Sequence, residues 1–341
     1  MALQEPPPPR PDWLRLTAEE PLEPGLPVCD SHHHLWDHGP GDRYLLEEML
    51  DDTGSGHNVV STVFVDCHSM YRSDGPAEMK PVGETEFANG IAAMSASGHC
   101  GATRIAAGIV GRADLGLGAA VAPVLEAHLA AGPRFRGIRH WLNWQDNASA
   151  FGLRSDAPPG QAFDAKFREG YACLGRYALS FDAWLYFHQL PDLVDLARAF
   201  PDIPVVLNHA GGVLGVGPHA GRDEAFRLWQ RNIAEVARCP NVFVKLGGLG
   251  VPRCGFGWHE RSAPPTSLQL AEAFAPYVLY CIEQFGPQRS MFESNFPADK
   301  IACSYTVLWN CFKRLTRGFS ATERSALFHG TAVRIYRLNE A

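Results

Sequence analysis

Residues 26–35 read LPVCDSHHHL, an apolar run that ends in three consecutive histidines. In an extended strand neighbouring side chains point to opposite faces, so His32 and His34 share one face and His33 lies on the other. Two imidazoles on one face, at the end of a strand, can grip one metal ion or one substrate group. The pattern therefore predicts a buried first strand whose end carries chemistry, rather than a histidine-rich surface turn.

Seven further runs rich in Val, Ile and Phe follow, and amphipathic segments with apolar residues at spacings of three and four lie between them. Strands that alternate with helices indicate a parallel sheet, and eight such units over 341 residues predict an α/β fold, a (β/α)8 TIM barrel. An open doubly wound sheet is the alternative, but no GxGxxG or Walker-type loop follows the first run. The seven runs are residues 59–67, 104–111, 135–142, 181–188, 203–210, 241–249 and 289–296.

The barrel accounts for one catalytic domain over residues 23–341. The sequence PPPPRP at residues 6–11 favours polyproline conformation, so residues 1–22 are expected to form an extended arm outside the core. Three long segments, 68–85, 143–162 and 250–270, each follow the end of a predicted strand. In a barrel such loops build the active-site face.

Charge and cysteine usage narrow the class of partner. The net charge of -7 comes without any block of like charges, which argues against a nucleic-acid or membrane-surface role and favours a small-molecule partner. Nine scattered cysteines without a CxxC pair indicate free thiols in a reducing cytoplasm. The N-terminal residues lack a signal-peptide pattern, and no apolar stretch is long enough to span a membrane. The oligomeric state is left open, a homodimer being one alternative.

Two more histidines close predicted strands at the same end of the barrel. His188 ends the fifth run, and His209 lies in the sixth. A lone histidine at a strand end is usually structural, but histidines from the first, fifth and sixth strands converge on the barrel axis. Zinc commonly takes three protein ligands and keeps one position for water, so the group is suited to a divalent metal, with zinc as the first candidate.

The order of these motifs resembles the amidohydrolase superfamily, specifically its amidohydrolase-2 branch of lactonases and decarboxylases. The opening D-x-H-x-H-x-W spans residues 30–36, and GIRH (137–140), NHAG (208–211) and SNFP (294–297) follow in order, so the resemblance covers about residues 26–337. It implies a barrel hydrolase or lyase. The resemblance also implies that His32, His34 and His188 are metal ligands and that His209 is catalytic or polarises the substrate.

One position departs from the family pattern. Many members end the eighth strand in S-D-x-P, whose Asp binds metal or takes a proton from water, and this Asp is Asn295 here. Asn cannot act as a general base. Asp299 is the candidate replacement, unless it caps the following helix or pairs with Lys300. Glu293 faces inward and is expected to form a structural ion pair with a cation such as Lys245.

Arginines crowd the predicted active-site face, and guanidinium groups bind carboxylates through two parallel hydrogen bonds. Together they predict an anionic substrate, although singly each is more often a surface ion pair. Aromatic neighbours could wall a ring. His68 is a weak further candidate for the pocket, and Glu84 and Glu86 are interpreted as acids that favour a helix dipole. The predicted substrate-binding residues are Arg72, Arg136, Arg139, Arg253, Tyr71 and Trp141.

Three functions remain open at this point. The leading hypothesis is a hydrolase that opens a lactone or related cyclic ester of a carboxylated small molecule. Water would be activated by Asp299 or by a metal, and His34 or His209 would polarise the carbonyl. The second is a metal-dependent non-oxidative decarboxylase of an aromatic or muconate-type acid, and the third is a non-catalytic barrel that binds an anionic ligand. Asn295 is the main support for the third.

Overall fold

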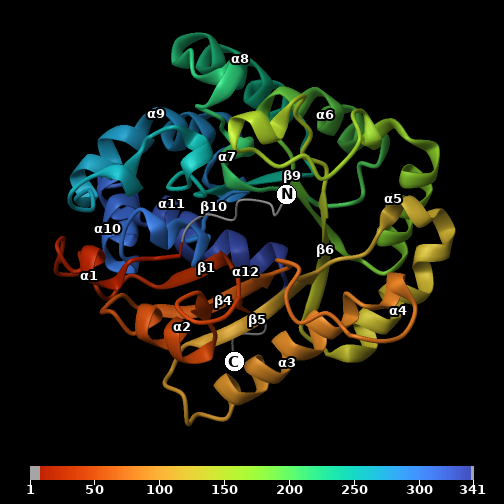
Figure 1. Ribbon diagram of the computed structural model, residues 1–341, viewed down its shortest axis with the longest axis horizontal. Coiled ribbons are helices and arrows are strands. Elements are labelled where there is room, and N and C mark those ends of the chain that lie inside the picture. The colour runs from red at the N-terminus through yellow and green to blue at the C-terminus, as the bar shows by residue number, and fades with distance from the viewer. Residues whose placement is uncertain (1–7, 339–341) are drawn as a thin grey trace.

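The computed structural model of the protein describes residues 8–338. Eight parallel strands form one sheet in the order β1-β4-β5-β6-β7-β8-β9-β10, and helices surround it (Figure 1). Each predicted run overlaps one of these strands, so the predicted (β/α)8 barrel is confirmed. The strands are β1 (Val28–His33), β4 (Val59–Val65), β5 (Arg104–Gly111), β6 (Phe135–Trp141), β7 (Ser180–Trp184), β8 (Val205–Leu207), β9 (Val242–Leu246) and β10 (Ser290–Phe292).

The first and last strands meet just beyond their ends. A parallel bridge joins His33 to Phe296, and the N–H of His34 donates to the carbonyl of Phe296 over 2.8 Å. The N–H of Asn295 donates to the carbonyl of His32 over 2.9 Å. These bonds nearly close the barrel, and they place the two most informative stretches of sequence, DSHHHLW and MFESNFPAD, side by side.

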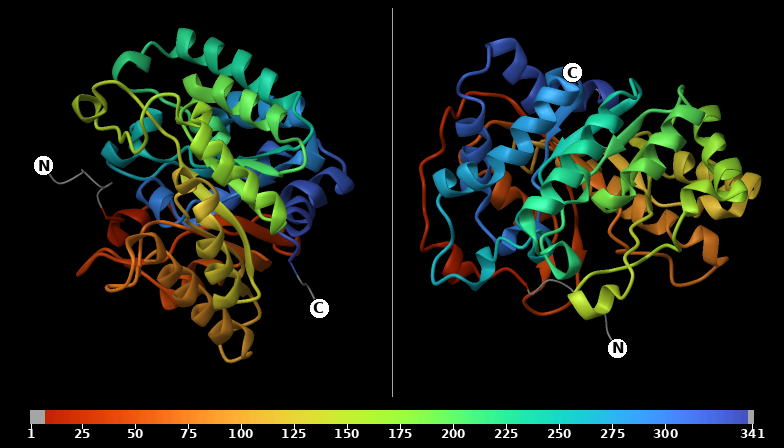
Figure 2. Two further views of the ribbon diagram at one scale, coloured as in Figure 1. Left: turned by 90° about the vertical axis from the view of Figure 1, so that its right-hand side faces the viewer. Right: turned by 90° about the horizontal axis from the view of Figure 1, so that it is seen from above.

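Most helices form the outer layer, and Figure 2 shows α6 and α8 running side by side on it. Two short strands, β2 (Trp36–Asp37) and β3 (Arg43–Tyr44), form a separate antiparallel pair after β1. The helices are α1 (Pro11–Leu14), α2 (Leu46–Thr53), α3 (Val82–Ala96), α4 (Ala122–Ala131), α5 (Ala165–Arg176), α6 (Leu190–Ala199), α7 (His209–Gly212), α8 (Arg222–Ala237), α9 (Ser267–Phe285), α10 (Tyr305–Leu315), α11 (Ala321–Ser325) and α12 (Thr331–Ile335).

The apolar core has two parts. The larger cluster packs the helices against the outer faces of the strands. A smaller cluster fills the barrel interior, where Cys29, Val63 and Val206 meet Tyr336 and Leu338 of the C-terminal segment. Helix α12 and Tyr336 fill the barrel interior toward the amino ends of the strands. An active site can therefore form only at the opposite, carboxyl ends of the strands.

The described part of the N-terminal arm packs on the domain. Trp13 is buried and donates to the carbonyl of Arg261, and Glu19 accepts hydrogen bonds from Ser267 and Asn310. Residues 1–7 of the predicted arm lie outside the described residues. None of the nine cysteines, which all lie within residues 8–338, forms a disulfide bond. Within residues 8–338, no helix is both long enough and apolar enough to cross a bilayer.

Candidate active site at the carboxyl ends of the strands

The end of β1 places two histidines edge to edge. The Nε2 atoms of His32 and His34 lie 3.2 Å apart, whereas His33 points elsewhere and meets the hydroxyl of Thr62 at 2.9 Å. This is the alternation that the sequence predicts. The Nδ1 atom of His34 lies 2.8 Å from the carbonyl oxygen of Val65, which can only accept. His34 therefore carries its proton on Nδ1 and directs a lone pair on Nε2 toward His32.

Glu293 joins His32 to a third histidine. Its Oε1 lies 2.8 Å from Nδ1 of His209, and its Oε2 lies 3.0 Å from Nδ1 of His32. His209 follows β8 with a positive φ of 55°, and its backbone N–H also donates to Glu293 over 3.1 Å. All three side chains are at most 3% exposed. Glu293 therefore fixes the orientation of His209 through two hydrogen bonds, and its Oε2, which has no hydrogen-bond partner within residues 8–338, lies against the ring of His32.

The expected direct ion pair between Glu293 and Lys245 is wrong. Lys245 pairs with Asp182 at 2.8 Å, and Asp182 also accepts a hydrogen bond from the hydroxyl of Tyr336. The register explains the difference, because Lys245 is level with Met291, two residues before Glu293, and lies deeper in the barrel. Its ammonium nevertheless remains 3.2 Å from Nδ1 of His32.

Burial keeps the three histidines neutral. The pKa of each of His32, His34 and His209 is well below its usual value, first because burial disfavours the charged form and then because Lys245, Arg139 or Arg253 adds positive charge nearby. Neutral imidazole is the form that binds a metal ion or accepts a proton.

The donor set fits a divalent metal. Two nitrogens bonded to one zinc ion at 2.0–2.1 Å and near the tetrahedral angle are about 3.3 Å apart, close to the 3.2 Å between Nε2 of His32 and Nε2 of His34. Without a cation between them, one of these two Nε2 atoms must carry a proton and donate it to the other. His32 can carry that proton on Nε2, because its Nδ1 accepts a hydrogen bond from Lys245. Among residues 8–338, one group of three, His32, His209 and Glu293, has ligand atoms within 4.8 Å of one another.

Asn295 and Asp299 form a buried pair beside this cluster. The amide of Asn295 donates to Oδ2 of Asp299, and the N–H of Gly250 donates to Oδ1. Burial raises the pKa of Asp299 to about 7, and the hydrogen bond from Asn295 and the charge of Arg253 offset part of that rise. Lys300 pairs instead with Asp52, so Asp299 lacks that structural partner. A carboxyl with a pKa near neutrality is suited to proton transfer.

Arg139 stands beside His209 at the centre of the site. It is 4% exposed, its Nη2 lies 3.4 Å from Nε2 of His209, and its Nη1 donates to the carbonyl of Asp66 over 2.9 Å. Trp184 packs its ring 5.0 Å from that of His209, and Arg253 covers Trp184 with its guanidinium carbon 4.6 Å from the ring centroid. The structure therefore brings two of the predicted arginines to the histidines.

Trp141 and Tyr71 lie on the β4 and β6 side of the site. Trp141 stacks on His68 with centroids 4.1 Å apart, and Arg139 lies 5.3 Å from its ring. The hydroxyl of Tyr71 donates to Asp66 over 2.9 Å. His68, which the sequence indicated only weakly, thus lies at the mouth of the barrel. The ring of Trp141 contacts both His68 and Arg139.

Glu84 has a role that its position in a helix did not reveal. It lies in the first turn of α3, but it is fully buried and accepts hydrogen bonds from the N–H groups of Cys67 and Ser69. Burial and the neighbouring Asp66 raise the pKa of Glu84 well above its usual value. For Asp66, burial alone would raise the pKa, but the hydrogen bond from Glu84 and nearby cations lower it to about 2. One proton shared by the pair holds the loop after β4.

His188 is not part of the histidine cluster. Strand β7 ends at Trp184, and His188 lies in a short 3-10 helix, η5 (Phe187–Gln189). Its Nε2 lies 3.1 Å from the carbonyl oxygen of Trp144, and its ring stacks on His219 with centroids 5.3 Å apart. His32, His34 and His188 do not form a group with mutually close ligand atoms in the described part of the chain.

Two predicted substrate-binding arginines also lie elsewhere. Arg72 forms a partly exposed ion pair with Glu86. Arg136 is the second residue of β6, at the amino end of the barrel, and donates to the carbonyls of Pro133 and Phe135. The structure does not bring either side chain to His34 or His209.

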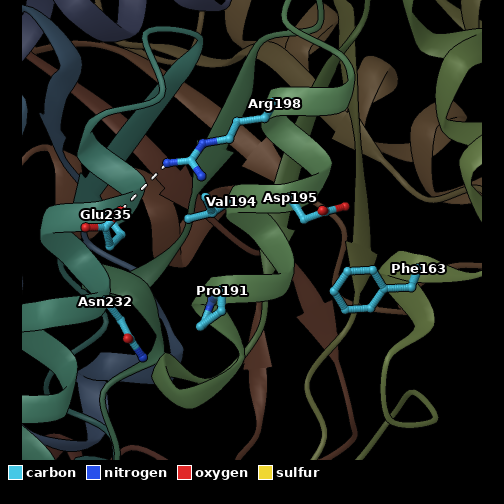
Figure 3. Close-up of a pocket in the computed structure, with 7 residues that line it drawn as sticks. All are labelled: Phe163, Pro191, Val194, Asp195, Arg198, Asn232 and Glu235. Carbon is cyan, nitrogen blue, oxygen red and sulfur yellow. Dashed lines mark ion pairs between the residues drawn. The ribbon is translucent and has the colours of Figure 1, made fainter.

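A surface cavity of about 400 Å³ lies outside this site. It is located between α6 and α8 on the outer layer of the barrel, where Arg198 and Glu235 form an ion pair at 3.7 Å (Figure 3). None of its lining residues is a histidine or belongs to a strand end, so it plays no part in the chemistry described above. The lining residues are Phe163, Pro191, Val194, Asp195, Arg198, Asn232 and Glu235.

Sequence reasoning missed Arg112 and Arg154. Their guanidinium carbons lie 6.0 and 4.6 Å from the ring centroid of Trp141. A signal was present in both cases. Arg112 directly follows the third predicted strand, and Arg154 lies in the long segment after the fourth.

Comparison with known proteins agrees with the (β/α)8 barrel. The amidohydrolase family model matches residues 29–338. The chain is 34% identical to the uncharacterized protein y4mH of Sinorhizobium fredii (92% of this chain, 99% of that protein) and 30% identical to an L-fucono-1,5-lactonase of Burkholderia multivorans (91% and 96%). A crystal structure of a Burkholderia multivorans amidohydrolase with bound Zn superposes with a TM-score of 0.69 at 27% identity (92% and 99%). The chain belongs to the amidohydrolase family, as a hydrolase of the amidohydrolase type.

Proposed function

We propose that this enzyme opens a lactone, or a related cyclic ester, of a carboxylated small molecule by attack of an activated water. The observation that carries the proposal is Asp299, a buried carboxyl with a pKa of about 7 beside the histidine cluster. The similarity to L-fucono-1,5-lactonases along nearly the whole chain supports lactone opening. Their substrate is not assigned to this chain, because the arginines here favour an additional negative charge on the substrate.

In the proposed mechanism, the carboxylate of Asp299, which Asn295 holds in place, takes a proton from water as the water oxygen bonds to the acyl carbon. The ring C–O bond at that carbon then breaks, and the leaving ring oxygen takes the proton back from Asp299 to become a hydroxyl. Arg139 donates a hydrogen bond to the carbonyl oxygen as negative charge develops on it. His209 accepts a hydrogen bond from Arg139 and donates one to Glu293, so it orients the guanidinium. His34 lies across the cluster with its Nε2 lone pair facing inward.

A divalent metal is proposed as cofactor, with zinc as the first candidate. His32 and His34 would hold it through their Nε2 atoms, and His209 and Glu293, whose ligand atoms lie within 4.8 Å of each other and of one on His32, border that position. When bound, zinc supplies Lewis-acid polarisation of a substrate oxygen. The zinc bound to the Burkholderia multivorans amidohydrolase supports this choice. His188, which resemblance alone would make a ligand, is not included. Nine cysteines without a disulfide bond among residues 8–338 support a cytoplasmic location.

A lactone panel tests the proposal. Proton release is measured at constant pH for five- and six-membered lactones with and without a carboxylate, and CO2 release is measured in parallel from aromatic acids. The proposal expects lactone opening and no CO2. Release of CO2 without lactone opening would favour the decarboxylase, and no turnover of either class would favour a barrel that only binds anions.

A further inference from the structure

Three guanidinium groups surround the ring of Trp141, the last residue of β6. The guanidinium carbons of Arg154, Arg139 and Arg112 lie 4.6, 5.3 and 6.0 Å from its centroid. The imidazole ring of His68 stacks on the ring of Trp141 with an interplanar angle of 20°. We name these five residues the Trp141 cluster.

The Trp141 cluster lies at the mouth of the barrel. His68 follows β4, Arg112 follows β5, and Arg154 belongs to the long segment after β6, so three neighbouring strands contribute from their carboxyl ends. The side chains of His68 and Arg154 are 31% and 36% exposed, whereas Arg139 and Trp141 are buried. The cluster therefore extends from the solvent to Arg139, which touches His209.

The acids around the Trp141 cluster do not neutralise it. Asp156 pairs with Arg154 at 2.9 Å, and Asp66 faces His68 at 3.8 Å while it shares a proton with Glu84. Arg112 forms no ion pair within 4 Å in the described part of the chain. Three permanent positive charges are thus set against two carboxylates and one protonated carboxyl.

The Trp141 cluster also has more buried donors than acceptors to receive them. Nη1 of Arg112, Nε of Arg139 and Nε1 of Trp141 are buried and have no hydrogen-bond partner within residues 8–338. One acceptor of the same region, Oδ1 of Asn143, lacks a donor but forms no hydrogen bond with those N–H groups, and the remaining oxygens of Asp66 and Glu84 share the proton held between these two acids. Buried N–H donors that lack partners are costly, so the cluster favours a ligand that brings acceptors.

We infer that Arg112 and Arg154, stacked with the His68 and Trp141 rings, form the subsite for the carboxylate of the substrate. The inference rests on the proposed lactone opening and deepens it. A guanidinium fork matches a carboxylate through two hydrogen bonds, and the stacked rings suit a flat carbon skeleton. Arg139 separates this subsite from His209, so the carboxylate of the substrate lies on the far side of Arg139 from the reacting carbonyl.

Substitution kinetics with a matched substrate pair test the subsite. Arg112→Gln and Arg154→Gln should raise KM for a carboxylated lactone about tenfold to a hundredfold, the effect of losing a charge-assisted hydrogen bond, and leave KM for its neutral methyl ester unchanged. Arg72→Gln is the control, because Arg72 pairs with Glu86 away from the site. Equal effects on both substrates, or none on either, would overturn the inference.

Binding of benzoate separates failure of the subsite from failure of the proposed function. Calorimetry should show that wild type binds benzoate more tightly than benzamide, that Arg112→Gln loses this preference, and that Arg72→Gln keeps it. This result supports the subsite even if no lactone is opened. A wild type that does not distinguish benzoate from benzamide contradicts the subsite. Arg154→Gln, which removes the other guanidinium of the subsite, replaces Arg112→Gln if that variant unfolds, and it should lose the same preference.

Discussion

The side-chain amide of Asn295 donates a hydrogen bond to the carboxylate of Asp299, four residues later and just beyond β10. The two residues occupy the place where the family resemblance expects a single Asp. In the proposed mechanism one role is thus divided between two side chains, since Asn295 stands just beyond the strand and Asp299 provides the carboxylate. Both are nearly inaccessible to solvent.

Asp299→Asn should lower kcat by about a hundredfold to ten thousandfold, which is the range for loss of a general base. Thermal unfolding should remain cooperative, because the neighbouring backbone donor of Gly250 can still meet the amide oxygen. Steady-state assay of the lactone selected by the panel checks this. A variant with wild-type kcat would remove Asp299 from the mechanism.

The rate should depend on pH through Asp299. Its pKa of about 7 means that kcat/KM rises with pH through 7, as the carboxyl loses its proton and becomes able to act as a base. In Asn295→Ala the hydrogen bond that stabilises the carboxylate is gone, so the pKa rises and the acidic limb moves to higher pH. If the acidic limb of the kcat/KM profile lies at the same pH in Asn295→Ala and wild type, a group other than Asp299 is responsible for it.

Bound zinc should depend on His34 and not on His188. Elemental analysis of protein prepared without chelator should find zinc in wild type, less in His34→Ala, and the wild-type amount in His188→Ala, since the His188 ring meets Trp144 and His219 instead. Equal loss in both variants would restore His188 to the ligand set. A wild type without metal would contradict the proposed cofactor.

Lys245→Met should destabilise the fold by about 3–5 kcal/mol, because it leaves Asp182 charged and buried without its cation. Tyr336→Phe, which removes one hydrogen bond to the same carboxylate, should cost only about 1 kcal/mol. Urea unfolding measures both free energies. If the two variants are equally stable, the Lys245–Asp182 pair does not hold the barrel interior together.

The barrel could be predicted because each strand carries its own apolar run and the helices between them keep their period. The position of His188 could not. The run FDAWLYFH is apolar to its end, but the strand stops at Trp184, and Leu185, Tyr186 and Phe187 are buried in a turn instead. Hydrophobicity alone does not distinguish a strand from a buried 3-10 turn.

The arginines show a similar limit. Proximity to a strand in sequence does not say which end of it a long side chain occupies, so Arg136 and Arg139, three residues apart on β6, serve opposite ends of the barrel. The Asp66–Glu84 pair joins a loop to a helix, and no local pattern reports such a contact. Asp299, by contrast, could be proposed from the sequence. Asn295 cannot act as the general base that the family resemblance expects there, and Asp299 is an acid close by in sequence.

Hydrolysis in water labelled with oxygen-18 tests the central claim most directly. If water attacks the acyl carbon of a lactone, mass spectrometry will find one labelled oxygen in the new carboxylate of the product and none in the new hydroxyl. Label in the hydroxyl, or a product that has lost a carboxyl carbon as CO2, would contradict lactone opening by attack of water at the carbonyl.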